Sequence, residues 1–267
     1  MQKNKGILVV SFGTSYEDTR RKTIGGIENR IAEIFPEFKV YRAFTSQFVC
    51  KKLRKAGVYV YDVEEALEVM LQEGITGEIV VQPTYILNGI ENDLMLESVK
   101  KYQDRFKKVR MGTPLLTSSE DYKELAHIIH NSYPVKEDEA LVLMGHGSEH
   151  YSNSAYPAFE YTLKILGYKH IYVGTVKGFP SFKEVKQQLK KDRFTKVNLV
   201  PLMIVAGAHV FNDMVWEKDS WREELEQDGY QVRCTLMGLG ELKEVQEMFI
   251  EHIHAARKEG QLMDKER

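Results

Sequence analysis

The chain has 267 residues, of which 43% are hydrophobic, and this is enough to bury a substantial core in one or two domains. Its 37 basic and 39 acidic residues give a formal net charge of -2, which argues against a large nucleic-acid-binding surface. No apolar stretch is long enough for a membrane span, and no signal peptide precedes the first predicted strand, so we expect a cytoplasmic protein that does not bind a membrane.

Short β-branched runs alternate with amphipathic stretches along the whole chain, a pattern typical of βαβ units and of a parallel sheet covered on both faces. In chain order, strands are predicted at residues 6–10, 38–43, 77–82, 109–111, 140–144, 170–176, 196–202 and 232–237. Helices are predicted between them, at residues 18–35, 62–73, 92–106, 119–131, 156–166, 181–190, 211–227 and 241–258.

Three sequence landmarks recur in the same order in the two halves of the chain. An apolar strand twice breaks into a loop of small residues, and this makes Phe12 equivalent to His146. In both halves a proline is followed six residues later by a glycine and then by a potential metal ligand, so that Glu91 is equivalent to His209. A Met-Gly pair completes each series. The offset of roughly 120 to 130 residues favours a duplicated domain over a short solenoid repeat.

The duplication predicts an α/β fold of two similar three-layer domains, each with a mostly parallel four-stranded sheet flanked by helices. We expect these domains at residues 1–134 and 135–267, because an acidic, proline-containing stretch interrupts the apolar rhythm between them. The C-terminal helix can pack on the other domain. Ligands of open parallel sheets bind beyond the carboxyl ends of the strands. We therefore expect an active-site cleft between the domains, with His146 and His209 facing each other because they follow corresponding strands of the two halves.

Both of these histidines have neighbours with small side chains, which leave room for a substrate. His146 lies between two glycines, and His209 follows an Ala-Gly-Ala sequence. A neutral imidazole can act as a base or bind a borderline metal near neutral pH. The alternative for each is a hydrogen-bonded structural histidine at a strand end. We expect most of the remaining histidines to be solvated on or beside helices, namely His127, His130, His170, His252 and His254.

Several motifs resemble the anaerobic sirohydrochlorin cobaltochelatases, which are class II chelatases related to ferrochelatase. The resemblance covers essentially the whole chain, and the motifs appear in order. They are VVSFGTSY at 9–16, RAFTS at 42–46, LNG at 87–89, MGHG at 144–147 and VAGAH at 205–209, followed by NDM at 212–214. The resemblance implies a lyase that inserts Co²⁺ into the tetrapyrrole sirohydrochlorin during cobalamin biosynthesis, without an organic cofactor. Fe²⁺ and Ni²⁺ are the alternative metals, and homo-oligomerisation stays open.

The resemblance also implies roles for individual residues. His146 would accept a pyrrole proton and bind the metal, and His209 would be a second metal ligand. The family pattern has a glutamate where this chain has Lys177, whose ammonium group repels a divalent ion. In one interpretation, Glu91, Glu149 or the macrocycle supplies the missing donor. In the other, Lys177 pairs with a tetrapyrrole carboxylate, and the chain is a tetrapyrrole carrier, sensor or chelatase homologue of altered activity.

The first-half loop can contact the substrate through hydroxyl groups and apolar surface. Ser11, Thr14 and Ser15 can donate hydrogen bonds to substrate carboxylates. Large apolar side chains can lie against the macrocycle, although core packing explains each of them equally well: Phe12, Phe44, Tyr85, Met203 and Phe211. The residues expected to bind the substrate are therefore Ser11, Phe12, Gly13, Thr14, Tyr85, Glu91 and Lys177.

Overall fold

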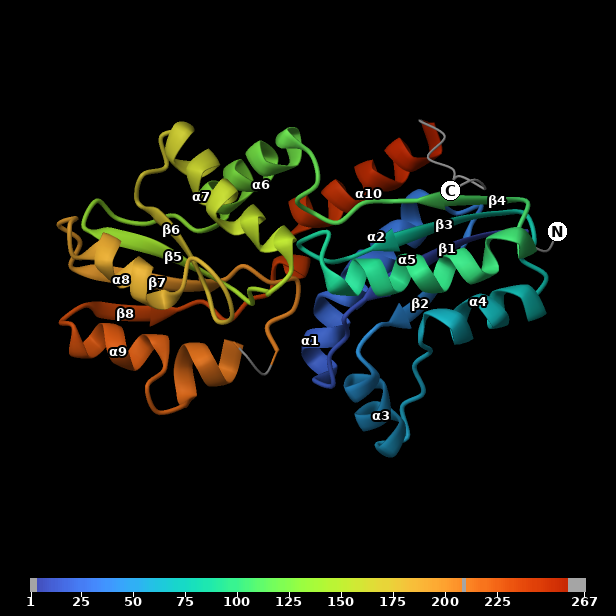
Figure 1. The fold of residues 1–267 in the computed structure, drawn as a ribbon, viewed down its shortest axis with the longest axis horizontal. Coiled ribbons are helices and arrows are strands. Elements are labelled where there is room, and N and C mark those ends of the chain that lie inside the picture. The colour runs from blue at the N-terminus through green and yellow to red at the C-terminus, as the bar shows by residue number, and fades with distance from the viewer. Residues whose placement is uncertain (1–3, 208–209, 259–267) are drawn as a thin grey trace. The chain divides into compact units, whose positions relative to one another are not determined.

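The computed structural model describes residues 4–207 and 210–258, which form two compact units (Figure 1). The first unit contains the chain up to Thr117 together with the residues from Gly240 onward. The second unit is continuous and runs from Ser118 to Leu239. This division differs from the expected boundary after residue 134, because the helix that precedes that boundary packs within the second unit.

The first unit is built on a sheet of four parallel strands in the order β2-β1-β3-β4. The strands are β1 (Lys5–Ser11), β2 (Lys39–Phe44), β3 (Glu78–Pro83) and β4 (Lys108–Met111). Its helices are α1 (Glu17–Lys22), α2 (Ile24–Ile34), α3 (Gln47–Lys55), α4 (Val63–Gln72), α5 (Ile90–Tyr102), the short η1 (Gln103–Arg105) and the C-terminal α10 (Lys243–Lys258).

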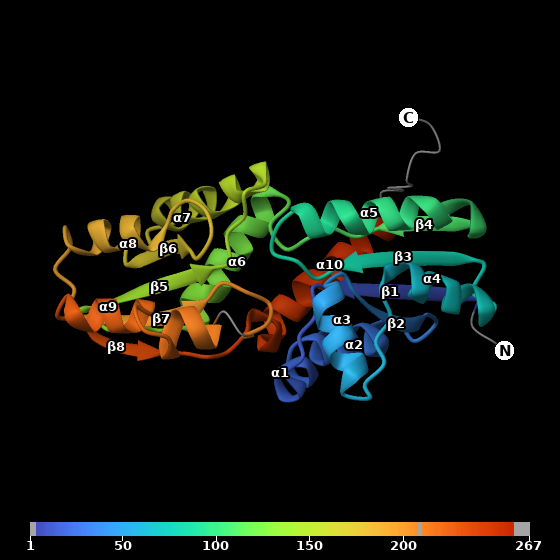
Figure 2. The same cartoon turned by 60° about the horizontal axis from the view of Figure 1, so that its bottom comes forward.

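The second unit repeats this arrangement with a parallel sheet in the order β6-β5-β7-β8 (Figure 2). The strands are β5 (Glu139–Gly145), β6 (Ile171–Thr175), β7 (Lys196–Pro201) and β8 (Gln231–Cys234). The helices are α6 (Ser119–Ser132), η2 (Tyr151–Ser154), α7 (Ala155–Ile165), α8 (Phe182–Leu189), the π-helix η3 (Val210–Trp216) and α9 (Trp221–Gln227), and η4 (Leu239–Glu241) precedes α10.

The predicted architecture of two similar α/β halves is confirmed, because the two sheets have the same strand order and are parallel throughout. The resemblance extends to the loops. Gly13 and Gly147 each lie just beyond the first strand of their sheet, and both have positive φ angles, of 96° and 76°. These are backbone conformations that glycine adopts without steric cost. The cleft expected between the halves stays a prediction.

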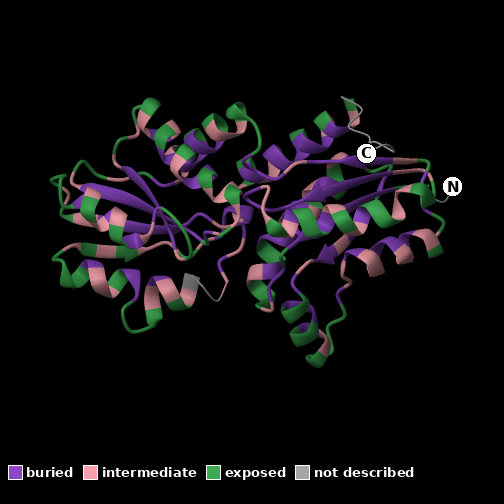
Figure 3. Cartoon of the chain, viewed as in Figure 1, coloured by how far each residue is buried: buried purple, intermediate pink, exposed green. Residues whose placement is uncertain are grey.

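The core explains why the strands are recognisable in the sequence. Figure 3 shows most strands of both sheets in the colour of buried residues, whereas the edge strand β8 and the helices also carry exposed residues. One face of the first sheet packs against α4 and α5, and α2 and α10 also contact this sheet. In the second sheet, α8 and α9 contribute to the core on one face. Strands buried on both faces are continuous apolar runs, as observed here.

Two predicted helices are interrupted, and one α-helix was not predicted. The helix expected at 18–35 breaks at Thr23, whose hydroxyl donates to the Thr19 carbonyl oxygen at 2.7 Å. The helix expected at 211–227 divides into η3 and α9, with Asp219 at a positive φ of 65° between them. The missed helix is α3, which Ser46 caps by accepting a hydrogen bond from Val49 N. Across the described residues, no helix is both long and apolar enough to cross a membrane.

Candidate functional site

His146 follows the buried strand β5, and its side chain is exposed. Its Nδ1 lies 2.9 Å from the carbonyl oxygen of Gly147. A carbonyl oxygen can only accept a hydrogen bond, so Nδ1 carries the proton and, in the neutral ring, Nε2 carries the lone pair. A backbone carbonyl that holds one imidazole nitrogen in this way is the usual orienting contact of histidines that bind metals or accept protons.

Lys177, in the loop after β6, contacts His146 through its backbone. Its N–H donates to the His146 carbonyl oxygen at 2.8 Å, and Val176 N donates to the Gly145 carbonyl oxygen at 3.0 Å. A Cβ atom on Gly147 would lie 1.7 Å from the Lys177 carbonyl oxygen, so only glycine fits there. The Lys177 side chain itself is exposed. The structure therefore brings this lysine and the predicted catalytic histidine to the same edge of the second sheet.

Two residues that sequence analysis missed support these loops. Asn153 Oδ1 accepts a hydrogen bond from Ser148 N at 2.9 Å, and Asn153 Nδ2 donates to the Phe179 carbonyl oxygen at 2.6 Å. The Tyr156 hydroxyl accepts from Gly147 N at 3.5 Å, and burial raises the pKa of this tyrosine to about 12. No local pattern marks either residue, because each contacts the site across a loop.

The two histidines do not follow strands of different halves, and their expected facing arrangement stays a prediction. The strands that precede them, β5 and β7, are neighbours in one sheet, and Met144 pairs with Pro201 in the ladder. His146 and His209 therefore follow adjacent strands of the second unit, whereas their sequence equivalents, Phe12 and Glu91, belong to the first. His209 itself lies outside the described residues. The π-helix η3 follows it, and such helices frequently occur at functional sites.

The predicted substrate-binding residues from Ser11 to Thr14 lie at the carboxyl end of strand β1 in the first unit. Phe12 is 50% exposed, whereas Ser11 and Thr14 are buried, with 2% and 5% exposed. The Ser11 and Thr84 hydroxyl oxygens are 2.6 Å apart. A Cβ atom on Gly13 would approach the Phe44 ring to 2.4 Å, so the loop packs tightly on β2. Substrate binding by these hydroxyls stays a prediction; in the structure the side chains of Ser11 and Thr14 point into the protein.

Tyr85 and Glu91 lie on the loop and helix that follow β3. The Tyr85 hydroxyl donates to Thr45 Oγ1 at 3.4 Å, and burial together with the Glu91 negative charge raises the pKa of Tyr85. Glu91 is in the first turn of α5. Its Oε2 is buried and has no hydrogen-bond partner among the described residues. A buried carboxylate oxygen without a partner is costly, so a cation or a donor from a ligand would stabilise it.

The other sequence candidates are less closely connected to these groups. Glu149 is exposed, and Phe44 is fully buried against Gly13. Met203 packs on the second core, and Phe211 stacks on Trp216 with ring centres 4.8 Å apart. Within residues 4–207 and 210–258, no three His, Cys, Asp or Glu side chains come together as a metal site. That range excludes His209, one of the two predicted ligands.

Comparison with known proteins identifies relatives along the whole chain. Residues 5–258 match the model of a family described as cobalt chelatase (CbiK). The sirohydrochlorin cobaltochelatase of Salmonella typhimurium is 34% identical over 255 residues, which cover 94% of this chain and 96% of the relative. Sirohydrochlorin cobaltochelatase CbiKC of Nitratidesulfovibrio vulgaris is 30% identical over 257 residues, covering 94% and 90%.

Solved structures show the same fold at lower sequence identity. SirB from Bacillus subtilis with Fe³⁺ superposes with a TM-score of 0.66 and 18% identity, covering 96% of this chain and 98% of that one. DR2241 from Deinococcus radiodurans has a TM-score of 0.61 and 14% identity, covering 98% of this chain and 56% of the larger protein. These similarities establish the fold alone.

Proposed function

Because the chain belongs to the cobalt chelatase (CbiK) family, we propose that it inserts Co²⁺ into sirohydrochlorin, as a step of anaerobic cobalamin biosynthesis. The enzyme is a tetrapyrrole metal chelatase, and the metal ion is its second substrate. The observation that carries the proposal is the exposed His146 ring, whose Nδ1 is held by the Gly147 carbonyl oxygen at 2.9 Å. Its Nε2 then has the lone pair that chelation requires.

Metal insertion replaces two pyrrole N–H protons by one divalent ion, so a base must act while the ion loses its water ligands. In our proposal, Nε2 of His146 accepts one of the two protons, and the other passes to water. His209 binds the incoming ion and releases it to the macrocycle. Imidazoles suit this transfer, because they bind borderline divalent ions without the closed thiolate cage that would retain them.

We assign the carboxylate role in this reaction to Glu91. Its buried Oε2 has no hydrogen-bond partner among the described residues, so a cation or a pyrrole N–H that reaches it would stabilise it. Glu149 is exposed and carries no comparable sign of a missing partner. With Glu91 in this role, the chain has a carboxylate donor even though Lys177 stands where the family pattern has a glutamate.

Anaerobic incubation with sirohydrochlorin and Co²⁺, followed by absorption spectroscopy, tests the proposal. We expect the wild-type chain to accelerate insertion above the uncatalysed rate, and to do so with Co²⁺ more than with Fe²⁺ or Ni²⁺. His146→Ala should lower the rate by about 10²- to 10⁴-fold, the usual contribution of a positioned acid or base. Glu91→Gln should lower it as well, whereas His254→Ala, in α10, should not.

The same assay separates catalysis from binding alone. A tetrapyrrole carrier or sensor would bind sirohydrochlorin without raising the rate of metal insertion above the uncatalysed rate. Wild-type insertion rates in His146→Ala would exclude the proposed base. Circular dichroism of each variant distinguishes a lost side chain from a lost fold.

A further inference from the structure

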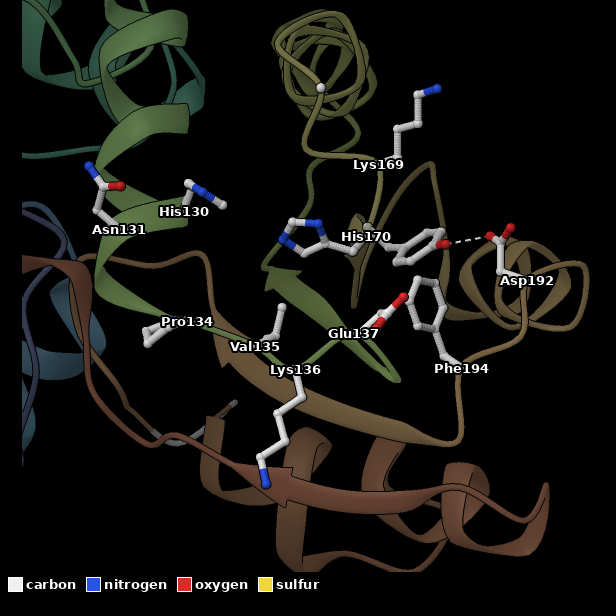
Figure 4. A pocket seen from close by; sticks show the side chains of 12 residues that line it. His130, Asn131, Pro134, Val135, Lys136, Glu137, Lys169, His170, Asp192 and Phe194 are labelled. Carbon is white, nitrogen blue, oxygen red and sulfur yellow. Dashed lines mark hydrogen bonds between the residues drawn. The ribbon is translucent and has the colours of Figure 1, made fainter.

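Two further histidines of the second unit lie at the opposite end of its strands from His146. A pocket of about 620 Å³ opens at the amino-terminal ends of the strands, and its lining includes His130 and His170 (Figure 4). Strand β5 separates this end from the His146 loop by seven residues. At about 3.3 Å per residue, this is roughly 20 Å. The pocket is therefore a separate site within the same unit.

The two imidazoles face each other at a distance suited to one metal ion. His130 is in the last turn of α6, and His170 immediately precedes β6. Their ring centres are 5.6 Å apart, with ring planes inclined by 53°. Figure 4 shows both rings directed into the same space. Two imidazoles that bind one ion at about 2.1 Å have ring centres about 5 to 6 Å apart, so little movement is needed.

Neighbouring contacts hold both histidines in place. The His130 ring stacks on Tyr168 with centres 4.0 Å apart and planes inclined by 15°. The Tyr168 hydroxyl is in turn 2.7 Å from Nδ1 of His127, one turn earlier in α6. The His170 carbonyl oxygen accepts a hydrogen bond from Leu141 N at 2.9 Å. The stacking holds the His130 ring, and the backbone hydrogen bond holds the main chain at His170, before any ligand binds, which lowers the entropic cost of binding.

The ring nitrogens of this pair are available to a ligand. Among the described residues, no side chain or backbone group forms a hydrogen bond with a ring nitrogen of His130 or His170, whereas His127 bonds to Tyr168. A neutral imidazole whose ring nitrogen forms no hydrogen bond has a lone pair to donate to a metal ion.

We propose that His130 and His170 bind one borderline divalent cation, such as Co²⁺ or Ni²⁺, at a site separate from the chelatase site. Imidazole pairs prefer such ions to Mg²⁺ or Ca²⁺, which require oxygen ligands. Within the described residues no third protein ligand stands close enough, so water completes the coordination and the ion exchanges readily. The charged residues in the pocket lining offset each other, with Lys136 and Lys169 against Glu137 and Asp192.

The test uses the full chain with the proposed chelatase ligands removed, as the variant His146→Ala/His209→Ala. Calorimetric titration with Ni²⁺ in phosphate-free buffer should show one bound ion per chain. Adding His130→Gln or His170→Gln should weaken binding about tenfold or more, since loss of even an outer-shell partner of a metal ligand costs that much. The matched control is His254→Gln, because the His254 ring centre lies 4.8 Å from that of Phe35 and, among the described residues, no histidine ring contacts it.

Paramagnetic broadening of histidine NMR signals by Co²⁺ should be strongest for His130 and His170, and it locates the ion independently of the variants. The proposal is overturned if the parent variant binds no ion, or if the His130 and His170 substitutions leave its affinity unchanged. It is also overturned if inorganic phosphate, and not Ni²⁺, binds in a manner that depends on Lys136 and Lys169. Because the parent variant lacks His146 and His209, these outcomes are independent of whether the chain is a chelatase.

Discussion

At the residue scale, the backbone around His146 is as important as the imidazole. Gly147 has a φ of 76°, and it lies where the loops after β5 and β6 touch. The two loops are joined by the hydrogen bond from Lys177 N to the His146 carbonyl oxygen. The orientation of the His146 ring therefore depends on a position that accepts no side chain.

Gly147→Ala should lower both stability and chelatase activity. A left-handed backbone costs a non-glycine residue roughly 1 to 2 kcal/mol, and the added Cβ would lie 1.7 Å from the Lys177 carbonyl oxygen. The matched control is Gly229→Ala, at a φ of 94° with nothing within 4 Å of the new Cβ. Urea unfolding should show a larger loss for Gly147→Ala. Equal losses would mean that the two loops do not pack as described.

Lys177→Glu should act in opposite directions on the two substrates. A carboxylate beside His146 should tighten Co²⁺ binding, because it replaces a repulsive charge by an attractive one. If the lysine anchors a tetrapyrrole carboxylate, the same change should weaken sirohydrochlorin binding by on the order of 1 to 3 kcal/mol. The two affinities must be measured separately, with the exposed Lys183→Glu as the control for net charge. If neither affinity changes, the side chain of Lys177 plays no part in binding.

At the scale of elements, local sequence patterns specify helices well, and single side chains connect the helices to the sheets. Asp62 and Glu65 form a reciprocal capping box at the start of α4. At the other end of α4, Glu73 accepts hydrogen bonds from Lys39 and Tyr41 of strand β2. This carboxylate therefore forms a polar connection between the end of α4 and the edge strand β2.

The Glu73 contact should make stability fall in acid. Hydrogen bonds from Lys39 and Tyr41 lower the pKa of Glu73 below its ordinary value. A carboxyl with a lowered folded-state pKa stabilises the fold above its unfolded pKa, about 4.3, and this contribution is lost as the pH falls through the folded value. Glu73→Gln should therefore be less stable than wild type at pH 6, with the difference shrinking toward pH 3 in urea titrations. A difference independent of pH would exclude a role for the charge.

At the scale of the whole molecule, the chain leaves the first unit at residue 117 and returns to it at 240. The returning helix α10 contributes buried side chains, including Phe249 and Ile253. Two hydrogen bonds connect it to the end of β4, from Arg110 Nη1 to the Ala256 carbonyl oxygen at 2.9 Å and between His252 Nδ1 and the Thr113 carbonyl oxygen at 3.0 Å. The first unit is therefore completed only by the last segment of the chain.

Truncation after residue 242 should unfold the first unit and leave the second folded. Loss of α10 exposes the apolar side chains that it covers, and burying several large apolar residues contributes about 1.5 to 3 kcal/mol for each. Limited proteolysis should then cleave residues 4–117 rapidly and spare a fragment close to 118–239. As a control, the full-length chain should resist cleavage in both units under the same conditions. Equal resistance of both units after truncation would contradict the division of the chain.

The sequence by itself determined the number of strands, their order along the chain, the duplication and the candidate His146. These features are local: strands buried on both faces are continuous apolar runs, and a glycine after a strand marks a turn wherever it occurs. The family motifs are local as well, which is why they could be read in order from 9–16 to 205–214.

Only the tertiary structure decided which of these local features meet. It placed β5 and β7 side by side in one sheet, buried Ser11 and Thr14, and connected Asn153 and Tyr156 to the loops around His146. It also brought together His130 and His170, which were expected to be solvated, with their ring centres 5.6 Å apart. Such contacts join residues that are far apart in the chain. Periodicity describes how a segment presents its own side chains, and it carries no information about the segment against which they pack.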